Sequence, residues 1–179
     1  MKVTKDFFYI TVIIILIGLC GQFYYDFHYK PRHDVSVYFS QNIKANEKLA
    51  QTIRDADNHI YFAIYTFTRA DIKDALLGAK HRGVEIKGVM DAEQSASIPE
   101  QKKILKELTD AGIPIKLDDH SGIMRLKTLV TEKTYFSGSY NWTASATNIN
   151  DEIIEIGSDE NVRNQYEKIL KELFNLYDK

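Results

Sequence analysis

The feature that most constrains the fold is a repeated alternation of short apolar stretches with longer amphipathic ones, which begins at Val35. In the short stretches apolar residues either alternate with polar ones or fill the stretch, and both patterns are typical of β-strands. In the longer stretches apolar residues recur every three or four positions, as on one face of an α-helix. Strands that alternate with helices along a chain indicate a layered α/β fold. We therefore expect an α/β sandwich in which helices flank a mixed central sheet.

The local signals place the boundaries of these elements. Thr68 and Asp71 predict a capping box at the start of one helix, and Ser158 predicts the cap of the last helix. Two strands could pair as a hairpin around Glu132 and Lys133. Strands are expected at residues 35–39, 59–67, 84–90, 113–117, 125–130, 134–137 and 152–156, and helices at 43–57, 70–82, 100–111 and after Ser158, where Val162, Tyr166, Ile169, Leu170, Leu173 and Tyr177 line one side.

The amino terminus is a different kind of segment. Residues 7–21 carry no charge, and aromatic residues at positions 23–25 extend them in the manner of a membrane-interface belt. The apolar span is roughly 15 to 19 residues, at the short end of the about 20 that a helix needs to cross a bilayer. We predict a single-pass anchor over residues 1–25, a linker over 26–34 and a domain over 35–179.

Other interpretations of this segment remain open. A cleaved signal peptide is one, although no A-x-A cleavage pattern is evident. A lipoprotein signal is another, but Leu19 stands before Cys20 where a small residue is expected. A buried core helix is disfavoured because β-branched residues crowd the stretch and it has no polar face.

The orientation in the membrane depends on the flanking charges. Lys2 and Lys5 favour an inside amino terminus, whereas Lys30 and Arg32 flank the other end. We expect a domain outside the cytoplasm, with a secreted protein as the alternative.

The overall charge gives little guidance about partners. There are 23 Lys and Arg residues against 25 Asp and Glu residues, for a net charge of -2. A balance of this kind gives no global preference for nucleic acid, so any phosphate site must be local. The single cysteine, Cys20, excludes an internal disulfide.

The residues that carry chemistry lie in the segment 122–152, GIMRLKTLVTEKTYFSGSYNWTASATNINDE. Lys127 is followed five positions later by Glu132, and then by Gly138, Ser139 and Asn141 in GSYNWT. This arrangement resembles the signature of the phospholipase D superfamily: His-x-Lys, an acidic residue five positions after the Lys, and a Gly-Ser-x-x-Asn element or a close variant. The acid is Glu instead of the usual Asp, and it lies one residue closer to the Gly-Ser element than is common.

The resemblance extends over roughly residues 35–174. The upstream strand-helix-strand resembles that of the small bacterial nuclease members of the superfamily. The resemblance of the motif to the superfamily signature implies that Lys127, Ser139 and Asn141 bind the phosphoryl oxygens. Glu152 resembles the downstream acid that orients the catalytic histidine, although it could instead be a solvent-facing strand residue. Glu132 is either a structural or orienting acid or a turn acid exposed to water.

One departure from the signature bears on activity, because Arg125 occupies the histidine position. In the superfamily one histidine attacks phosphorus to form a phosphohistidine, and the histidine of a second motif protonates the leaving oxygen. Guanidinium cannot replace the nucleophile, since it stays protonated and has no free lone pair. Arg125 can still bind phosphate through two parallel hydrogen bonds. His120 is a conceivable substitute nucleophile, but a histidine in a loop is more often simply exposed.

The resemblance implies hydrolysis of phosphodiesters, in phospholipid degradation or as an endonuclease. We therefore expect a phosphodiesterase of phospholipase D type, impaired by Arg125. The alternative is a non-catalytic module that binds phosphate or nucleic acid. A pure membrane scaffold would leave the retained motif residues unexplained. A single motif builds half of a two-motif site, so the resemblance implies a homodimer with the site on the two-fold axis. We expect no cofactor and no metal, because the family chemistry needs none.

Overall fold

The computed structural model describes residues 2–28, 35–40 and 44–177. The chain forms two compact units, Met1–Arg32 and His33–Lys179.

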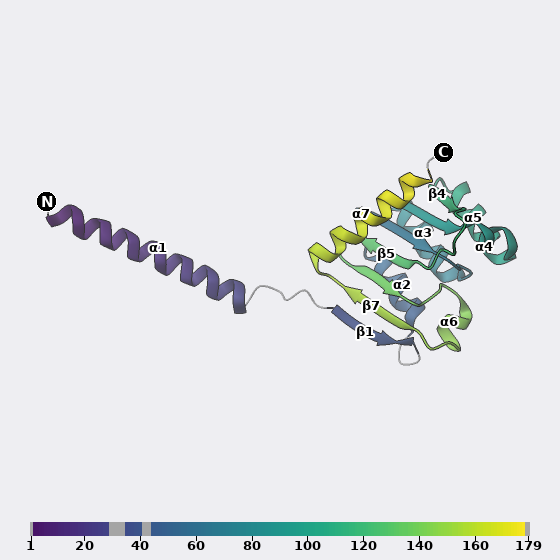
Figure 1. The fold of residues 1–179 in the computed structure, drawn as a ribbon, viewed down its shortest axis with the longest axis horizontal. Helices are drawn as coiled ribbons and strands as arrows, with labels where there is room; N and C mark the ends of the chain where they lie inside the picture. The colour runs from purple at the N-terminus through teal and green to yellow at the C-terminus, as the bar shows by residue number, and fades with distance from the viewer. Residues whose placement is uncertain (1, 29–34, 41–43, 178–179) are drawn as a thin grey trace. The chain divides into compact units, whose positions relative to one another are not determined.

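The first unit contains one helix, α1 (Lys2–His28) (Figure 1). Its span Lys5–Asp26 has 22 residues and a mean hydropathy of 2.1, and none of it is buried. Among the described residues it is the one helix long and apolar enough to cross a membrane, although a signal sequence has the same character. The lack of burial argues against a core helix. The helix continues through His28, so residues 26–28 belong to it and not to the expected linker, whose remaining residues lie outside the described part of the chain.

The second unit is built on one seven-stranded sheet with the order β1-β7-β6-β5-β2-β3-β4. Strands β2, β3 and β4 are parallel to one another, whereas β5, β6, β7 and β1 pair antiparallel with their neighbours. This mixed sheet confirms the expected fold class, and the hairpin of β5 and β6 turns at the expected place. The strands are β1 (Val35–Phe39), β2 (His59–Ile64), β3 (Glu85–Asp91), β4 (Ile115–Asp118), β5 (Lys127–Thr131), β6 (Tyr135–Gly138) and β7 (Ile153–Gly157).

Helices lie on both faces of the sheet (Figure 1). One face packs against α2, α3 and α5, and the other packs against α7. Successive residues of a strand point to opposite faces, and β2 shows this directly: Phe62 and Ile64 join the first core, whereas Tyr61 and Ala63 join the second. The helices are α2 (Ala45–Arg54), α3 (Ala70–His81), α4 (Ala92–Ser97), α5 (Pro99–Asp110), α6 (Ala144–Asn148) and α7 (Glu160–Leu176).

The edge strand β1 has its apolar side turned outward. The side chains of Val35, Val37 and Phe39 are 48%, 63% and 40% exposed. They lie on the face that α7 covers farther along the sheet, and Phe39 pairs with Ile153, which is 60% exposed. The alternation therefore predicted a strand correctly, but no described residue covers the apolar side. We call these four residues the open sheet face.

The predicted helix caps were wrong in two places. Helix α3 begins after Arg69 without a side-chain cap, because Asp71 instead accepts hydrogen bonds from Arg69 (Nη2 to Oδ2, 2.7 Å) and Asn46 (Nδ2 to Oδ2, 2.7 Å). Helix α7 is capped by Asp159, whose Oδ1 accepts from the backbone N–H of Val162 at 2.9 Å, and not by Ser158. A carboxylate one residue downstream thus replaces the expected hydroxyl.

Other differences concern short or partly exposed elements. Helices α4 and α6 were not predicted, because six and five residues are too few to show a helical period. On α7 the side chain of Ile169 is 53% exposed, and Phe174 is buried instead. Residue 43, where the expected helix 43–57 begins, lies outside the described residues, and α2 buries Leu49 and Ile53.

Candidate phosphate site

The strand directions bring several sequence-predicted residues to one edge of the sheet. The carboxyl end of β2 is paired with the amino end of β5, where Ile64 stands opposite Lys127. The end of β6 is paired with the start of β7, where Gly138 stands opposite Ile154. Ser139 and Glu152 are the residues just beyond these two strand ends. We call this end of the sheet, with the loops that leave it, the site edge.

Ser139 and Glu152 are joined at the centre of the site edge. The Ser139 hydroxyl donates a very short hydrogen bond to Glu152 Oε2, and its oxygen accepts from the backbone N–H of Ile153 at 3.2 Å. Asn150 Nδ2 donates to Glu152 Oε1 at 3.2 Å. Glu152 is buried, at 7% exposure. A buried carboxylate needs such donors, so Glu152 is not a solvent-facing strand residue.

Gly138 explains why the motif has glycine before Ser139. Its φ of +148° lies in the region that side chains rarely adopt. A Cβ at this position would lie 2.1 Å from the carbonyl oxygen of Ile153. The close approach of β6 to β7 therefore requires glycine, and it sets the position of Ser139 beside Glu152.

Lys127 begins β5 and reaches toward the same edge. Its Nζ donates to the carbonyl oxygen of Arg125 at 3.0 Å and lies 5.4 Å from the centre of the Tyr65 ring. Burial lowers the pKa of Lys127, the charge of Arg125 lowers it further, and the nearby Glu152 carboxylate raises it in part, so that the pKa is below its usual value. A half-buried ammonium group is suited to binding an anion.

Arg125 lies two residues before Lys127, and its side chain is exposed. Among the described residues its guanidinium has no hydrogen-bond or ion-pair partner. Glu152 binds Ser139 and Asn150 rather than Arg125. The structure thus leaves the Arg125 guanidinium available to an external anion.

Asn141 follows Ser139 in the turn after β6. Its side-chain oxygen is buried, and no described residue donates to it. The neighbouring Tyr140 and Trp142 are fully buried. Trp142 packs edge-on against Phe67, with ring centres 4.9 Å apart. These aromatic residues therefore pack in the core, and the contact with Phe67 holds the turn against the end of β2.

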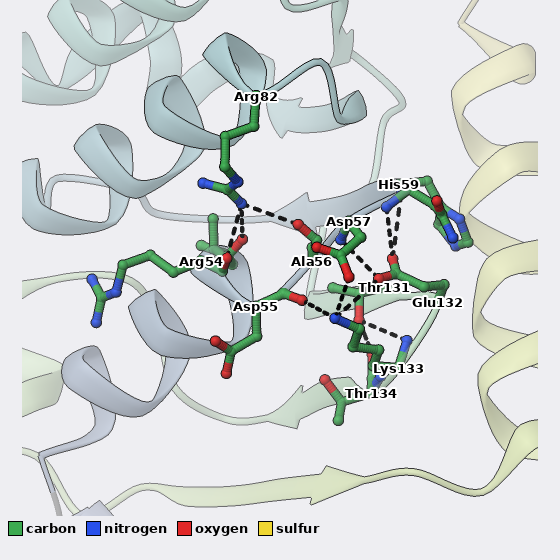
Figure 2. A network of polar contacts seen from close by, with 12 residues as sticks. Arg54, Asp55, Ala56, Asp57, His59, Arg82, Thr131, Glu132, Lys133 and Thr134 are labelled. Atoms are coloured by element: carbon green, nitrogen blue, oxygen red, sulfur yellow. Dashed lines mark hydrogen bonds and ion pairs between the residues drawn. The ribbon is translucent and has the colours of Figure 1, made fainter.

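Glu132 is not brought to the site edge but lies in a separate polar network, which Figure 2 shows. It follows β5, at the opposite end of the sheet, where its carboxylate accepts from the backbone N–H of Asp57 at 2.8 Å and of Asn58 and His59 at 3.3 and 3.4 Å. Burial alone would raise the pKa of Glu132, but these N–H groups stabilise the carboxylate and hold the pKa below its usual value. Glu132 therefore organises the turn between α2 and β2.

The same turn is held from two other sides, as Figure 2 shows. Arg82 Nη2 donates to the carbonyl oxygens of Ile53, Arg54 and Ala56 at 2.9 to 3.2 Å, which satisfies the last carbonyls of α2. Lys133 Nζ donates to the Asp55 carbonyl oxygen at 2.6 Å. The acid at the fifth position after the motif lysine is thus part of a structural network.

His120 contacts the buried acid Asp118, which lies at a distance from Lys127. Its Nδ1 makes a very short contact with Asp118 Oδ1, which also accepts from the Tyr177 hydroxyl at 2.5 Å. Asp118 ends β4, and β3 and β2 separate that strand from β5. At about 4.8 Å per strand, Asp118 and Lys127 are on the order of 14 Å apart across the sheet. The structure does not bring Asp118, the partner that fixes His120, next to the motif.

Two residues at this edge were missed from the sequence. The Ser40 hydroxyl accepts from the backbone N–H of Glu152 at 3.0 Å and donates to the Asn150 carbonyl oxygen at 2.9 Å. Gln101, fully buried on α5, accepts from the backbone N–H of Phe67 at 2.8 Å and donates to the Tyr65 carbonyl oxygen at 3.2 Å. Ser40 has no local sequence signal, and Gln101 resembles any polar residue of a helix surface.

The described residues contain no group of three or more His, Cys, Asp or Glu side chains that could hold a metal ion. The chemistry of the site edge is therefore that of one half-buried lysine, one exposed arginine, a serine hydroxyl and a buried glutamate. These groups can bind a phosphoryl group and orient it. Among them none is an imidazole.

Comparison with known proteins gives consistent results. A family profile described as "Cardiolipin synthase, PLD-like domain" matches residues 49–174. A phospholipase D of Rickettsia prowazekii is 28% identical over 144 residues, which cover 80% of this chain and 69% of that protein. A mitochondrial cardiolipin hydrolase of Xenopus tropicalis is 29% identical over 149 residues, or 83% of this chain and 70% of that protein.

A solved structure has a similar fold. It is the crystal structure of Nuc from Salmonella typhimurium, a phospholipase D family member. It superposes with a TM-score of 0.75 at 25% sequence identity, and the match covers 80% of this chain and 95% of that one.

Proposed function

Because the chain belongs to the family of phospholipase D-like domains, we propose that its site edge binds the phosphoryl group of a phosphodiester, in a phospholipid or a nucleic acid, as a phosphodiesterase of phospholipase D type. The observation that carries this proposal is the convergence of Lys127, Ser139 and Glu152 at one edge from three separate strand ends. The names of the relatives support the reaction class, since they include phospholipases and cardiolipin hydrolases.

The roles follow from the chemistry of each group. Lys127 and Arg125 carry positive charge that stabilises the phosphoryl oxygens. The Ser139 hydroxyl exchanges its hydrogen bond with Glu152 for one to a phosphoryl oxygen, and the Asn141 amide donates through its NH₂ group. Glu152 keeps the loop in place through its donors, and it can orient an imidazole placed at position 125.

The same chemistry limits the rate. Covalent attack on phosphorus needs a lone pair, and Arg125 has none at accessible pH. What remains is positioning and electrostatic stabilisation, which in a hydrolase stripped of its nucleophile can still exceed solution chemistry by roughly 10³ to 10⁴-fold. Uncatalysed diester hydrolysis is so slow that this gain would stay below the detection of an ordinary assay. We therefore propose that the chain binds diesters and hydrolyses them slowly.

The test compares three proteins: the chain with Arg125, Arg125→His, and Arg125→Asn. The asparagine variant removes the guanidinium charge without supplying a nucleophile. Turnover of bis-p-nitrophenyl phosphate, single-stranded DNA and phosphatidyl lipids is measured with chelator present. Only Arg125→His should gain activity, and mass spectrometry should find a phosphohistidine intermediate at the substituted position. Full activity of the Arg125 protein, with phosphate on another residue such as His120, would refute this assignment.

A second function is favoured by one observation, the exposed Arg125 guanidinium without a described partner. A residue of this kind binds phosphate well and cannot cleave it. In this alternative the chain is a non-catalytic module that binds phosphate or nucleic acid. It predicts that Arg125→Asn weakens phosphate binding and that Arg125→His restores no turnover.

We also propose that the domain forms a homodimer in which two motifs share one site. The open sheet face supports this, because it would be buried by a second copy of the chain. The expected result is a dimer in sedimentation at micromolar concentration. Val37→Asp places a charge on the open sheet face and should weaken the dimer. A parent protein that sediments strictly as a monomer, as this variant does, would argue against the homodimer.

The membrane location is a further part of the proposal. The length and hydropathy of α1 support a single-pass anchor, and we propose that the domain lies outside the cytoplasm. The full chain should fractionate with membranes, and the domain should be cut by protease added outside spheroplasts. Recovery of an uncleaved chain in the soluble fraction would exclude the anchor.

A further inference from the structure

Two loops at the site edge expose large apolar side chains. The loop that leads from β4 to Lys127 carries Ile123 and Leu126, which are 57% and 37% exposed. The loop that leads from α6 to Glu152 carries Ile149, which is 74% exposed, more than any other large hydrophobic side chain described in the second unit. We call these three residues the isoleucine rim. They stand on loops that enter the phosphate site from different strands.

The backbone beneath the rim is fixed. Met124, between Ile123 and the motif, is 3% exposed and packs in the core under α7. The backbone N–H groups of Ile149 and Asn150 donate to the Ser145 carbonyl oxygen at 2.8 and 2.9 Å. The rim side chains are thus held outward by ordered loops. Large apolar side chains exposed on two loops that lead into a polar site are candidates for a surface that another apolar phase or molecule covers.

The charges of these loops distinguish the possible partners. Residues 119–126 and 149–152 contain one cation, Arg125, and three acids, Asp119, Asp151 and Glu152. Binding of a nucleic-acid strand relies on a track of lysines and arginines, and these loops do not form one. A lipid interface does not require such a track, because exposed apolar side chains can enter the acyl boundary while one arginine beside them meets a lipid phosphate.

The sequence supplies a second reason to consider a bilayer. Six residues, 29–34, separate α1 from β1, and an extended chain spans at most about 3.5 Å per residue. A helix retained in a membrane would therefore keep the second unit close to the surface of that membrane. Docking of the unit would then cost little translational freedom.

We propose that the isoleucine rim docks into the interface of a phospholipid bilayer, so that the site edge receives the phosphodiester of a membrane phospholipid. This inference rests on the proposed function for the identity of the bound group. It adds the source of that group and the surface that meets it. Arg125 lies within the first of these loops and Lys127 directly after it, where the two cations can meet the headgroup phosphate.

The test uses the full chain in nanodiscs of phosphatidylcholine and phosphatidylglycerol, at one chain per disc. Cys20→Ser removes the native thiol, and an environment-sensitive fluorophore is attached at Ile123→Cys or Ile149→Cys. The control is Asn58→Cys, an exposed position at the opposite end of the sheet. The labels at 123 and 149 should shift to the blue and be quenched by nitroxide-labelled lipid, whereas the label at 58 should do neither.

Two results would overturn the proposal. In the first, the labels at 123 and 149 emit as they do in water, or the label at 58 is quenched by nitroxide-labelled lipid to the same extent. In the second, the blue shift needs two chains per disc and occurs without lipid quenching, which would assign the rim to a second copy.

A matched pair of substitutions connects docking with activity in the Arg125→His background. Ile149→Asp should lower hydrolysis of bilayer phospholipid, relative to bis-p-nitrophenyl phosphate, by about tenfold or more, since it removes an apolar side chain from the interface. Ile169→Asp, also at an exposed isoleucine but on α7, should leave this ratio unchanged. Equal ratios for both variants would overturn the proposal.

The docking signal does not depend on turnover. Quenched labels on an Arg125→His protein that hydrolyses no diester would refute the proposed function alone. Hydrolysis of the soluble diester with labels that remain in water would refute the docking alone.

Discussion

Replacement of Glu132 separates a structural role from a catalytic one. The residue occupies the acidic position of the motif, yet its carboxylate accepts from three backbone N–H groups at the end of the sheet opposite Lys127. Its side chain is 17% exposed, so most of the carboxylate is shielded from water. We predict that Glu132→Ala unfolds the domain more easily and leaves anion binding at the site edge unaltered.

The magnitude follows from the three contacts. A hydrogen bond to a charged group contributes about 1.5 to 3 kcal/mol. The contact to Asp57 is short, at 2.8 Å, whereas the other two, at 3.3 and 3.4 Å, are long and weaker. Because the turn is partly exposed, water replaces some of what is lost. We therefore expect Glu132→Ala to lower the free energy of unfolding by about 2 to 3 kcal/mol, and Glu132→Gln by about half as much, since an amide oxygen still accepts.

The assay is urea unfolding of residues 33–179, followed by fluorescence of the single tryptophan, Trp142, which is fully buried. The matched control is Glu172→Ala, an acid whose side chain is 67% exposed, and we expect a change below about 0.5 kcal/mol. Thermal protection by phosphate is measured on the same proteins. If Glu132→Ala unfolded like the parent but lost phosphate protection, the structural assignment would be wrong.

Three further predictions concern the site edge and the ion pairs. Lys127→Ala should reduce the thermal protection given by phosphate, and the control Lys168→Ala, far along α7, should not; equal protection in all three proteins would place the pocket elsewhere. Because Arg125 adds to the burial that lowers the pKa of Lys127, Arg125→Gln should raise that pKa, so that phosphate binding persists to higher pH; an unchanged pH profile would contradict the coupling. The hydrogen bond from Arg69 is the largest cause that lowers the pKa of Asp71 from 3.8 to about 2. This interaction therefore stabilises the folded state at pH values above the pKa of Asp71 in the unfolded chain, and the stabilisation is lost as the pH falls from about 4 towards 2. Asp71→Asn should therefore flatten the acid limb of the stability profile in that range, and an identical limb would show that other groups control it.

The sequence by itself determined the fold class and predicted the residues of the candidate site. Periodicity depends on local backbone geometry, so the alternation after Val35 was enough to predict strands, helices and a mixed sheet. The motif residues Lys127, Ser139 and Glu152 could be singled out because their spacing is a linear property. The apolar, uncharged stretch of α1 was equally plain, since hydropathy requires no knowledge of the fold.

Only the tertiary structure decided which residues meet and which faces are covered. The spacing of Glu132 predicted an acidic motif residue, but the five-residue strand β5 carries it to the far end of the sheet from Lys127. Ser40 reaches Asn150 across 110 positions of sequence, and no local pattern encodes such a contact.

The sequence also leaves undetermined which apolar side chains are covered by other parts of the fold. The period of β1 shows that Val35, Val37 and Phe39 share a side, but not that the side lacks a neighbour, because what packs on a strand depends on where the rest of the chain lies. The same holds for the isoleucine rim: the sequence shows that its residues are apolar but not that they are exposed. Their exposure around the site follows from strand order, which brings the loops before Lys127 and Glu152 to one edge.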